Sequence, residues 1–556
     1  MSTRWYQLTP LLLGVVFAGL FAGPALNDWG QSALGTPGST APIELWRIWA
    51  YADQASGDAV RMGYPAATQQ LSDTALLPTM IAGGLAHLFG SVVGAWNATM
   101  LTGFMVLIGG TIWLAQRLSP TGTILARITF VIAVVGATGW SPLLLHLGVG
   151  ATSLMWTPLF LALLHIWMQP RAHWLSGVAA ATVYTAGMLG PWPLTTLFIA
   201  MTVPMAVIMT RHLEGRDSLL RTGLSMAPGL LTGVTIIALE HADSTVYDVS
   251  PGLLAPAWIH QAKGALVLPA TASVALPSLG ILILALAGVS ARPRGTAGWL
   301  LVATWGILLS GGTEPESTRF MLPAYHMGQS IPALQQLSAW WMVAPLVSIP
   351  LGIAAMRGVE ALHKVRRDGI TLGVLLLAFV DQALPSVIYT QAHTINSSAP
   401  AGVATALGTV PKGAILQLPQ PNRERSDAHR LWQRTHGRSI STAPPHGEDG
   451  GLLLSYLARL SVQFLHNPPA RPSADSPLSP STYLCAAADL ATLHDLGFTA
   501  VLLDKKIEGH PAHEEMLHMV LGDPTHSSEN AVLWSIQDAI VNDPPDPCAL
   551  PSITQR

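Results

Sequence analysis

Long apolar runs separated by short polar breaks dominate the chain up to about residue 390. A membrane-spanning helix needs about 20 mainly apolar residues, and runs near this length recur eleven times before the composition changes. The predicted spans are 7–26, 97–116, 126–144, 147–168, 174–190, 193–210, 222–240, 271–290, 297–312, 338–356 and 370–389. Such repetition indicates a polytopic α-helical membrane protein of about eleven spans rather than one soluble core.

The distribution of lysine and arginine predicts the orientation of these spans. With the N-terminus inside, the inside loops hold 13 basic residues, and the outside loops before the tail hold 4. The positive-inside rule therefore predicts a cytoplasmic N-terminus, in a protein of the inner- or plasma-membrane type. The first apolar run, from Leu8 to Leu26, also resembles a signal peptide, but it is long enough to span and we expect it to be retained.

The first outside loop, 27–96, is long and of mixed composition. Its stretch 43–55 predicts a helix with Trp46 and Trp49 on one side, as expected for a helix in the headgroup layer. The apolar segment 76–90 predicts a re-entrant or interfacial helix. We therefore expect a transmembrane domain over 1–394 that carries this loop on its outer face.

The tail, 395–556, is richer in histidine, proline and charge. Short apolar stretches at 414–418 and 499–503 predict buried strands, and 449–464 and 486–496 predict helices. Together they predict a small extracytoplasmic α/β domain. Both cysteines, Cys485 and Cys548, lie here; outside the cytoplasm they are permitted to form a disulfide, and two unpaired thiols are the alternative.

Composition narrows the function only slightly. Half of the residues are apolar and 11% are charged, whereas soluble proteins carry about 25% charged residues. The net charge of −3 and the absence of a basic face exclude nucleic acid as a partner. Membrane lipid is the partner that this composition predicts.

The residue with the strongest claim to chemistry is Asp28, which directly follows the first span in Asn27-Asp28-Trp29-Gly30. A carboxylate at the membrane–water boundary can stay ionised, act as a general base toward a hydroxyl, or help to hold a divalent cation on a phosphate. The alternative is that Asp28 caps a helix or merely ends the span.

The chain resembles the GT-C superfamily of membrane glycosyltransferases, and more closely its bacterial multi-pass, uncharacterised branch. The resemblance rests on short motifs spread over the whole chain. They are Asp28-Trp29, Tyr64-Pro65, Ser141-Pro142 before His146-Leu147-Gly148, Trp156-Thr157-Pro158-Leu159, Leu322-Pro323, Ile331-Pro332, 410–419 and Gln433-Arg434-Thr435-His436-Gly437-Arg438.

The resemblance implies an inverting glycosyltransferase that uses a polyprenyl-phosphate-linked sugar donor and an acceptor on the outer face. Asp28 would match the acidic residue of the first loop, as base or metal-linked carboxylate, and a divalent cation is a possible cofactor. Asp53 and Asp58 are candidates for a second acid of that loop. Two positions depart from the pattern: Thr152 stands where relatives often carry an acid, and 338–341 lacks their arginine.

A donor phosphate needs cations at the outer boundary, and Arg319, Lys263, His260 and His326 are the available set. Arginine suits bidentate phosphate contacts, and lysine acts as a point charge. The alternative is that these side chains anchor loops at the headgroups. Glu240, at the end of the seventh span, is either a further active-site acid or an ordinary interfacial carboxylate.

The histidines of 510–518 are a weaker candidate site than Asp28. They include a pair five residues apart, which does not place two zinc ligands on one helical face, so we expect a solvated helix there.

Two alternative functions stay open. One is a transporter or flippase for a lipid-linked substrate, which the lack of internal repeats disfavours. The other is a non-catalytic membrane assembly protein.

Overall fold

The fold was analysed in a computed structural model of the whole chain. It describes residues 5–26, 28–35, 41–53, 76–137, 139–211, 216–242, 278–310, 323, 326–327, 340–391, 394–396, 402–418, 432–433, 436–441, 480–506 and 510–536. The chain divides into two compact units. Residues 1–44 and 72–395 form the helical unit, and residues 45–71 and 396–556 form the sheet unit.

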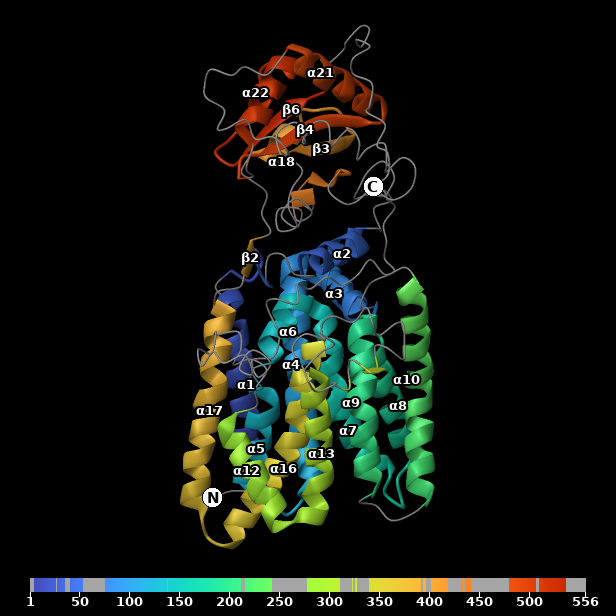
Figure 1. Ribbon diagram of the computed structural model, residues 1–556, viewed down its shortest axis with the longest axis vertical. Helices are drawn as coiled ribbons and strands as arrows, with labels where there is room; N and C mark the ends of the chain where they lie inside the picture. The colour runs from blue at the N-terminus through green and yellow to red at the C-terminus, as the bar shows by residue number, and fades with distance from the viewer. Residues whose placement is uncertain are drawn as a thin grey trace. The chain divides into compact units, whose positions relative to one another are not determined.

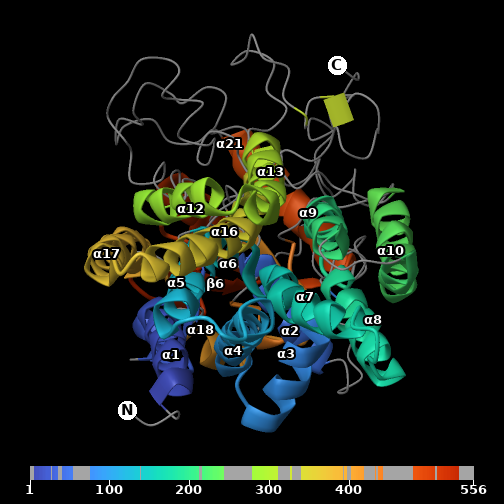
Figure 2. The ribbon, with the colours of Figure 1, turned by 90° about the horizontal axis from the view of Figure 1, so that it is seen from below.

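Helices running side by side build the helical unit (Figures 1 and 2). Every predicted span overlaps helical structure. In order the helices are α1 Trp5–Leu26, α3 Leu76–Phe89, α4 Val92–Leu118, α5 Ile124–Val135, α6 Trp140–Leu147, η2 Gly148–Trp156, α7 Thr157–Trp167, α8 Trp174–Met188, α9 Trp192–Arg211, α10 Arg216–Ala242, α12 Leu279–Ala291, α13 Pro293–Ser310, η6 Trp340–Val343, α16 Ala344–Lys364 and α17 Asp368–Gln391.

Five helices of the described part are long and apolar enough to cross a membrane. They are Val92–Leu118, Gly148–Trp167, Trp192–Arg211, Asp217–Ala238 and Ala344–Lys364. The apolar window of Ala344–Lys364 is 78% buried and that of Asp217–Ala238 only 28%, so α16 is central and α10 peripheral. Helix α16 packs against α5, α12 and α13 (Figure 2). The number of spans stays a prediction.

Two predicted spans are broken where the sequence supplies glycine. The span expected over 126–144 ends as α5 at Val135, and a new helix, α6, starts at Trp140. The indole of Trp140 donates to the carbonyl of Val134 at 2.8 Å and so closes the gap. Gly148 follows α6 with φ +59°, a left-handed conformation that suits glycine, and η2 replaces the first turns of the next expected α-helix. The prediction of one continuous helix over 126–144 is wrong for this reason.

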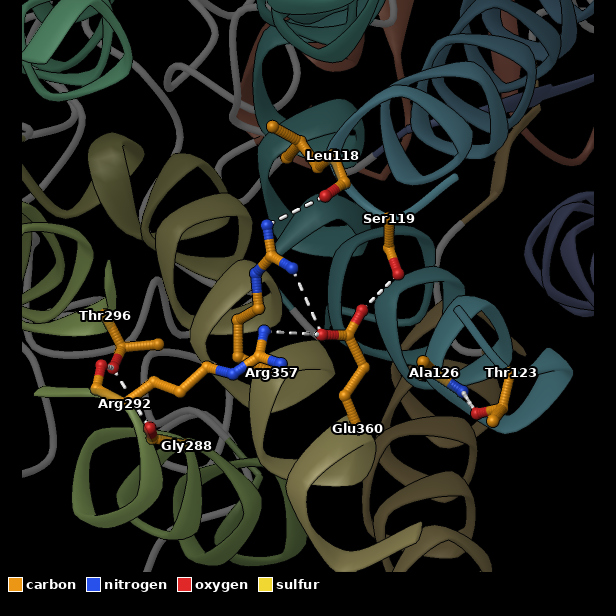
Figure 3. A network of polar contacts seen from close by, with 9 residues as sticks. All are labelled: Leu118, Ser119, Thr123, Ala126, Gly288, Arg292, Thr296, Arg357 and Glu360. Atoms are coloured by element: carbon orange, nitrogen blue, oxygen red, sulfur yellow. Dashed lines mark hydrogen bonds and ion pairs between the residues drawn. The ribbon is translucent and has the colours of Figure 1, made fainter. Parts of the chain in front are cut away.

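Polar side chains join the end of α4 and the α12–α13 connection to the last turns of α16 (Figure 3). Glu360 of α16 accepts hydrogen bonds from Ser119, which follows α4, and from Arg292, which lies between α12 and α13, the latter at 3.3 Å. Arg357 donates to the same carboxylate at 3.1 Å and to the carbonyl of Leu118 at 2.7 Å. These segments are all predicted to lie inside, and the network places them at one end, as the alternation of spans requires.

A four-stranded mixed sheet forms the core of the sheet unit. Its strands are β3 Ala414–Leu418, β4 Phe498–Asp504, β5 His526–Ser527 and β6 Ala531–Ser535, in the order β3-β4-β6-β5. Strand β3 is parallel to β4, and the other pairs are antiparallel. Helices α18 Val403–Leu407, α21 Pro480–Asp495 and α22 His510–Leu521 complete the unit. The strands expected at 414–418 and 499–503 and the helix expected at 486–496 are present, and 449–464 lies outside the described residues.

Two apolar clusters cover the two faces of this sheet. Leu416 and Val501 belong to one cluster with α21 and α22, and Ile415 and Leu502 belong to the other with α18. Alternate residues of a strand point to opposite faces, so strands β3 and β4 are apolar on both sides. In the helix expected to be solvated, α22, one face packs on the sheet and His513 is only 2% exposed, while residues such as His518 and Met519 are exposed.

Candidate active site

Asp28 lies in the turn that follows α1, and its side chain is exposed. The carbonyl oxygen of Asp28 accepts the amides of Gln31 at 3.1 Å and of Ser32 at 2.9 Å. This turn leads into β1, Ser32–Leu34, which pairs with β2, Thr394–Asn396. The backbone around Asp28 is therefore fixed by hydrogen bonds, while the residue stays open to solvent.

Asn97 of α4 holds this turn in place. Its amide nitrogen donates to the carbonyls of Trp29 at 3.1 Å and Ser32 at 3.0 Å, and its oxygen accepts the amide of Leu34 at 3.2 Å. Asn97 is fully buried, so its hydrogen bonds replace those that the backbone would otherwise make to water. The preceding residue, Trp96, donates from its indole to the carbonyl of Leu34 at 2.8 Å.

A second acid of the first loop reaches the same end of α4. Glu44 lies in the first turn of α2, Ala41–Asp53, is 2% exposed, and accepts the amide of Gly150 at 3.2 Å. A Cβ placed on Gly148 would come within 2.9 Å of this carboxylate and 2.1 Å of the ring of Trp96. Because Trp96 and Asn97 are neighbours, the Glu44 contact and the turn behind Asp28 are both attached to one turn of α4.

Glu44 is not among the residues that the sequence motifs single out. It is the second residue of the helix predicted over 43–55, whose aromatic side carries Trp46 and Trp49, and no recognisable motif surrounds it. Trp46 and Trp49 of that helix are 1% and 8% exposed, so protein buries them. The expectation that both rings lie in the headgroup layer is wrong, because the indole of Trp46 donates to the side chain of Gln433, also in the sheet unit, at 2.6 Å.

Most of the other nominated residues fall outside what can be placed. Asp58, Lys263, His260 and Arg319 lie outside the described residues. Asp53 and Glu240 lie on helices, α2 and α10, but their side chains are outside the described part as well. His326 is described and exposed. The roles of Asp28 and of the donor-phosphate residues all stay predictions.

The two departures from the resemblance have different outcomes. Thr152 is buried, and its hydroxyl donates to the carbonyl of Val149 at 2.7 Å. Its methyl group packs on Gly103 of α4, where an added Cβ would come within 2.8 Å. Thr152 thus fills a helix contact. Positions 338 and 339 lie outside the described residues.

The motif around Gln433 and Arg438 serves the structure of the sheet unit. The guanidinium of Arg438 donates to three carbonyls, those of Leu407, Val410 and Pro411. Partial burial lowers the pKa of Arg438 from its usual value. Gln433 donates to the carbonyl of Arg438 at 2.8 Å, and so this motif closes loops around the sheet.

The described residues hold no group of three or more histidine, cysteine, aspartate or glutamate side chains that could bind a metal ion. Asp28 alone is an incomplete ligand set for a divalent cation. The carboxylate of Glu44 is already engaged with the amide of Gly150. The described donors by themselves do not form a cation site, and a divalent cation stays a prediction.

No model of a known protein family matches the sequence, and no curated protein matches it. Solved structures do. The arabinofuranosyltransferase AftD from Mycobacteria is similar with a TM-score of 0.59 and 14% identity, over 96% of this chain and 40% of that protein. ArnT from Cupriavidus metallidurans is similar with a TM-score of 0.51 and 13% identity, over 95% of this chain and 99% of ArnT.

ArnT bound to undecaprenyl phosphate is also similar, with a TM-score of 0.50 and 12% identity over 98% of this chain and 100% of ArnT. The chain thus spans about two fifths of the length of AftD and nearly the full length of ArnT. Likeness at such low identity speaks for the architecture alone. With its apolar helices, the chain is an integral membrane protein that shares its fold with AftD and ArnT.

Proposed function

We propose that this protein transfers a sugar from a polyprenyl-phosphate donor to an acceptor on the outer face of the membrane. The observation that carries the proposal is the exposed carboxylate of Asp28 on a turn that buried Asn97 holds in place, in a chain with the GT-C fold. AftD is an arabinofuranosyltransferase, and ArnT has been seen with undecaprenyl phosphate. Sugar transfer in the first and a bound polyprenyl phosphate in the second together support a lipid-linked sugar donor for this chain.

In the proposed reaction Asp28 acts as the general base. Its carboxylate takes the proton of an acceptor hydroxyl while the hydroxyl oxygen attacks the anomeric carbon. The bond from that carbon to the phosphate oxygen breaks, and the electron pair leaves with the polyprenyl phosphate. A single displacement of this kind inverts the anomeric configuration. General-base assistance typically contributes about 10²- to 10⁴-fold in rate.

Glu44 is a positioning residue in this scheme. It is buried and bound to the backbone at Gly150, so it is not available to take a proton from an acceptor. It fixes the segment that follows α6 against the first loop. Asp53, Asp58 and Glu240 remain candidates for a second acid, and Arg319, Lys263, His260 and His326 remain candidates for the leaving phosphate.

The test is sugar transfer in membranes that contain the full-length protein. The donors are undecaprenyl phosphates carrying a labelled sugar, beginning with arabinofuranose and followed by other pentoses and by hexoses. We expect Asp28→Asn to lower transfer at least 100-fold, the scale of a lost general base. Asp217→Asn is the matched control, because Asp217 is an exposed aspartate in the first turn of α10 and should keep full activity.

Full transfer by Asp28→Asn would overturn the role of Asp28. Transfer from none of these donors by the unaltered protein would overturn the proposed reaction. In that case a non-catalytic assembly protein becomes the better description, an alternative that the buried Thr152 at an expected acid position favours. A flippase would instead move the labelled lipid between leaflets without any transfer, which the same membranes can show.

A further inference from the structure

A cavity lies at the opposite end of α4 from the candidate active site. Its volume is about 290 Å³, and its walls include His165, Arg292, Arg357 and the apolar side chains of Leu118, Met209 and Trp299. All of these residues belong to the helical unit. Cationic and apolar groups therefore line one space that the proposed reaction at Asp28 does not use.

The cavity is separate from the site around Asp28. Asn97 holds the turn behind Asp28, and Leu118, 21 residues further along α4, lines the cavity. At 1.5 Å of rise per residue, these two points of α4 are about 30 Å apart. This is about the thickness of the hydrocarbon core of a bilayer, so the cavity lies at the other membrane boundary.

Positive charge exceeds negative charge around the cavity. Glu360 pairs with both Arg292 and Arg357, so one carboxylate faces two guanidinium groups. Arg117, at the end of α4, lies close enough to His165 to act on it electrostatically, as does Arg357. An anion in this space would be attracted by the remaining positive charge.

The donors around the cavity are only partly used. The side chain of Arg292 is 41% exposed and makes one ion pair among the described residues, to Glu360. The Nδ1 atom of His165 is buried and has no hydrogen-bond partner among the described residues. An unpaired buried polar atom is costly and calls for a partner. Guanidinium and imidazole groups together are a donor set that suits the oxygens of a phosphate.

We propose that this cavity binds a phosphate group, at the boundary opposite to Asp28. The phosphate could belong to an anionic phospholipid of that leaflet or to a soluble phosphate. Its apolar wall of Leu118, Met209 and Trp299 would contact the glycerol and upper acyl carbons of a lipid. Basic pockets between membrane helices on the cytoplasmic side are a known way of holding acidic headgroups.

Native mass spectrometry of the delipidated full-length protein in detergent tests this proposal. The probes are phosphatidylglycerol, phosphatidylcholine and inorganic phosphate, each titrated separately. We expect saturable binding of phosphatidylglycerol that Arg292→Gln weakens about tenfold, the typical effect of removing one charge-assisted hydrogen bond. Arg294→Gln is the matched control: it removes the same charge two residues away, from an exposed side chain that does not line the cavity.

A second pair of variants tests the cavity without changing charge. Gly295 lines the cavity, and a Cβ placed on it would meet nothing within 4 Å. Gly295→Leu should fill the space and abolish the same binding. Gly369→Leu, an equivalent change at an open glycine near the start of α17, should bind as the unaltered protein does.

The outcomes separate the sources of the phosphate. Stronger binding of phosphatidylglycerol than of the other two probes supports a lipid headgroup site. Binding of inorganic phosphate that is as tight, and is weakened by the same two variants, supports a soluble phosphate at the same place. If Arg292→Gln and Gly295→Leu bind every probe as their controls do, the proposal is overturned. Sugar transfer need not change in any of these variants, so this result is independent of the proposed function.

Discussion

The two ends of α4 hold their surroundings in different ways. At the end near Asp28, neutral side chains of α4 make the contacts to the segment after α1: the buried amide of Asn97 and the indole of Trp96 bind its backbone atoms, while the carboxylate of Glu44 binds a different segment, at Gly150. At the other end, charged groups make them: the carboxylate of Glu360 joins Arg292 and Arg357 (Figure 3). Because neutral groups hold the turn, the carboxylate of Asp28 is not needed to hold it and is available for chemistry. At the other end, the carboxylate of Glu360 itself joins the helices.

This difference has an energetic basis. A buried amide that satisfies three backbone groups has no charge to desolvate, so its loss removes hydrogen bonds directly. In an ion-pair cluster, the attraction between the charges is partly offset by the free energy that their desolvation costs. When one partner is removed, water can also reach the remaining, partly exposed charges. We therefore expect the neutral end to be more sensitive to substitution than the charged end.

Asn97→Ala should give the largest effect. It leaves the carbonyls of Trp29 and Ser32 and the amide of Leu34 without their partner. With net values of about 1 kcal/mol for each such bond, the free energy of unfolding should fall by about 3 kcal/mol. Unfolding in mixed detergent micelles, with sodium dodecyl sulfate as denaturant, measures this change.

Thr102→Ala is the control for that substitution. Thr102 lies on the same helix, and its hydroxyl donates only to the carbonyl of Ala98 one turn before it. The bond is exposed, so its loss should change stability little. If both variants lost the same free energy of unfolding, the effect of Asn97→Ala would come from a change within α4 and not from the lost hydrogen bonds to the turn.

Glu360→Ala should rank second. It leaves Arg292 and Arg357 without their carboxylate and Ser119 without its acceptor. Removing one partner of a fully buried pair costs about 3–5 kcal/mol, and here the side chains of the arginines are 41% and 26% exposed. Because of this exposure, we expect the free energy of unfolding to fall by about 2 kcal/mol in the same measurement.

Asp368→Asn serves as the comparison for Glu360. Asp368 pairs with His363 at 2.8 Å, and both side chains are about half exposed. An exposed pair contributes little to stability, so the unfolding midpoint should not move. A loss as large as that of Glu360→Ala would contradict the idea that burial, rather than charge pairing itself, makes the cluster matter.

Arg357→Gln should rank third, ahead of Arg292→Gln. Arg357 is the less exposed of the two and also donates to the carbonyl of Leu118. Its loss should cost about 1 kcal/mol, the usual net value of a hydrogen bond. Arg292 makes a single, longer contact to Glu360, and its substitution should cost less. A larger loss of stability in Arg292→Gln than in Arg357→Gln would show that the cluster stabilises mainly the α12–α13 connection and not the end of α4.

The sequence predicted the helices well and their interruptions poorly. Apolar runs of span length are a strong signal, and each overlaps helical structure. The break between Val135 and Trp140 was not predicted, because glycine is common in membrane helices and Gly136 and Gly139 therefore gave no signal of a helix end. Sheet strands such as 414–418 were recognisable because residues apolar on both faces make a continuous short run.

Only the residue of the candidate site that sequence position alone singles out, Asp28, could be predicted. Asp28 follows the first apolar run directly, and this placement can be read without knowing the fold. The roles of Asn97 and Glu44 depend on contacts across 65 and 106 positions of the chain, which no local pattern contains. The cavity of Arg292 and Arg357 likewise arises from helices that are far apart in sequence.

Asp28→Asn should have the smallest effect on stability, and this makes it the sharpest test of the difference between the two ends. The carboxylate is exposed, and the turn is held by the backbone of Asp28 and by Asn97, neither of which the substitution alters. The unfolding midpoint of Asp28→Asn should therefore equal that of the unaltered protein, while transfer falls. A clear drop in the midpoint would mean that the side chain of Asp28 is part of the scaffold, as Glu360 is at the other end. Loss of transfer would then follow from a disturbed turn, and a general base would have to be sought elsewhere in the first loop.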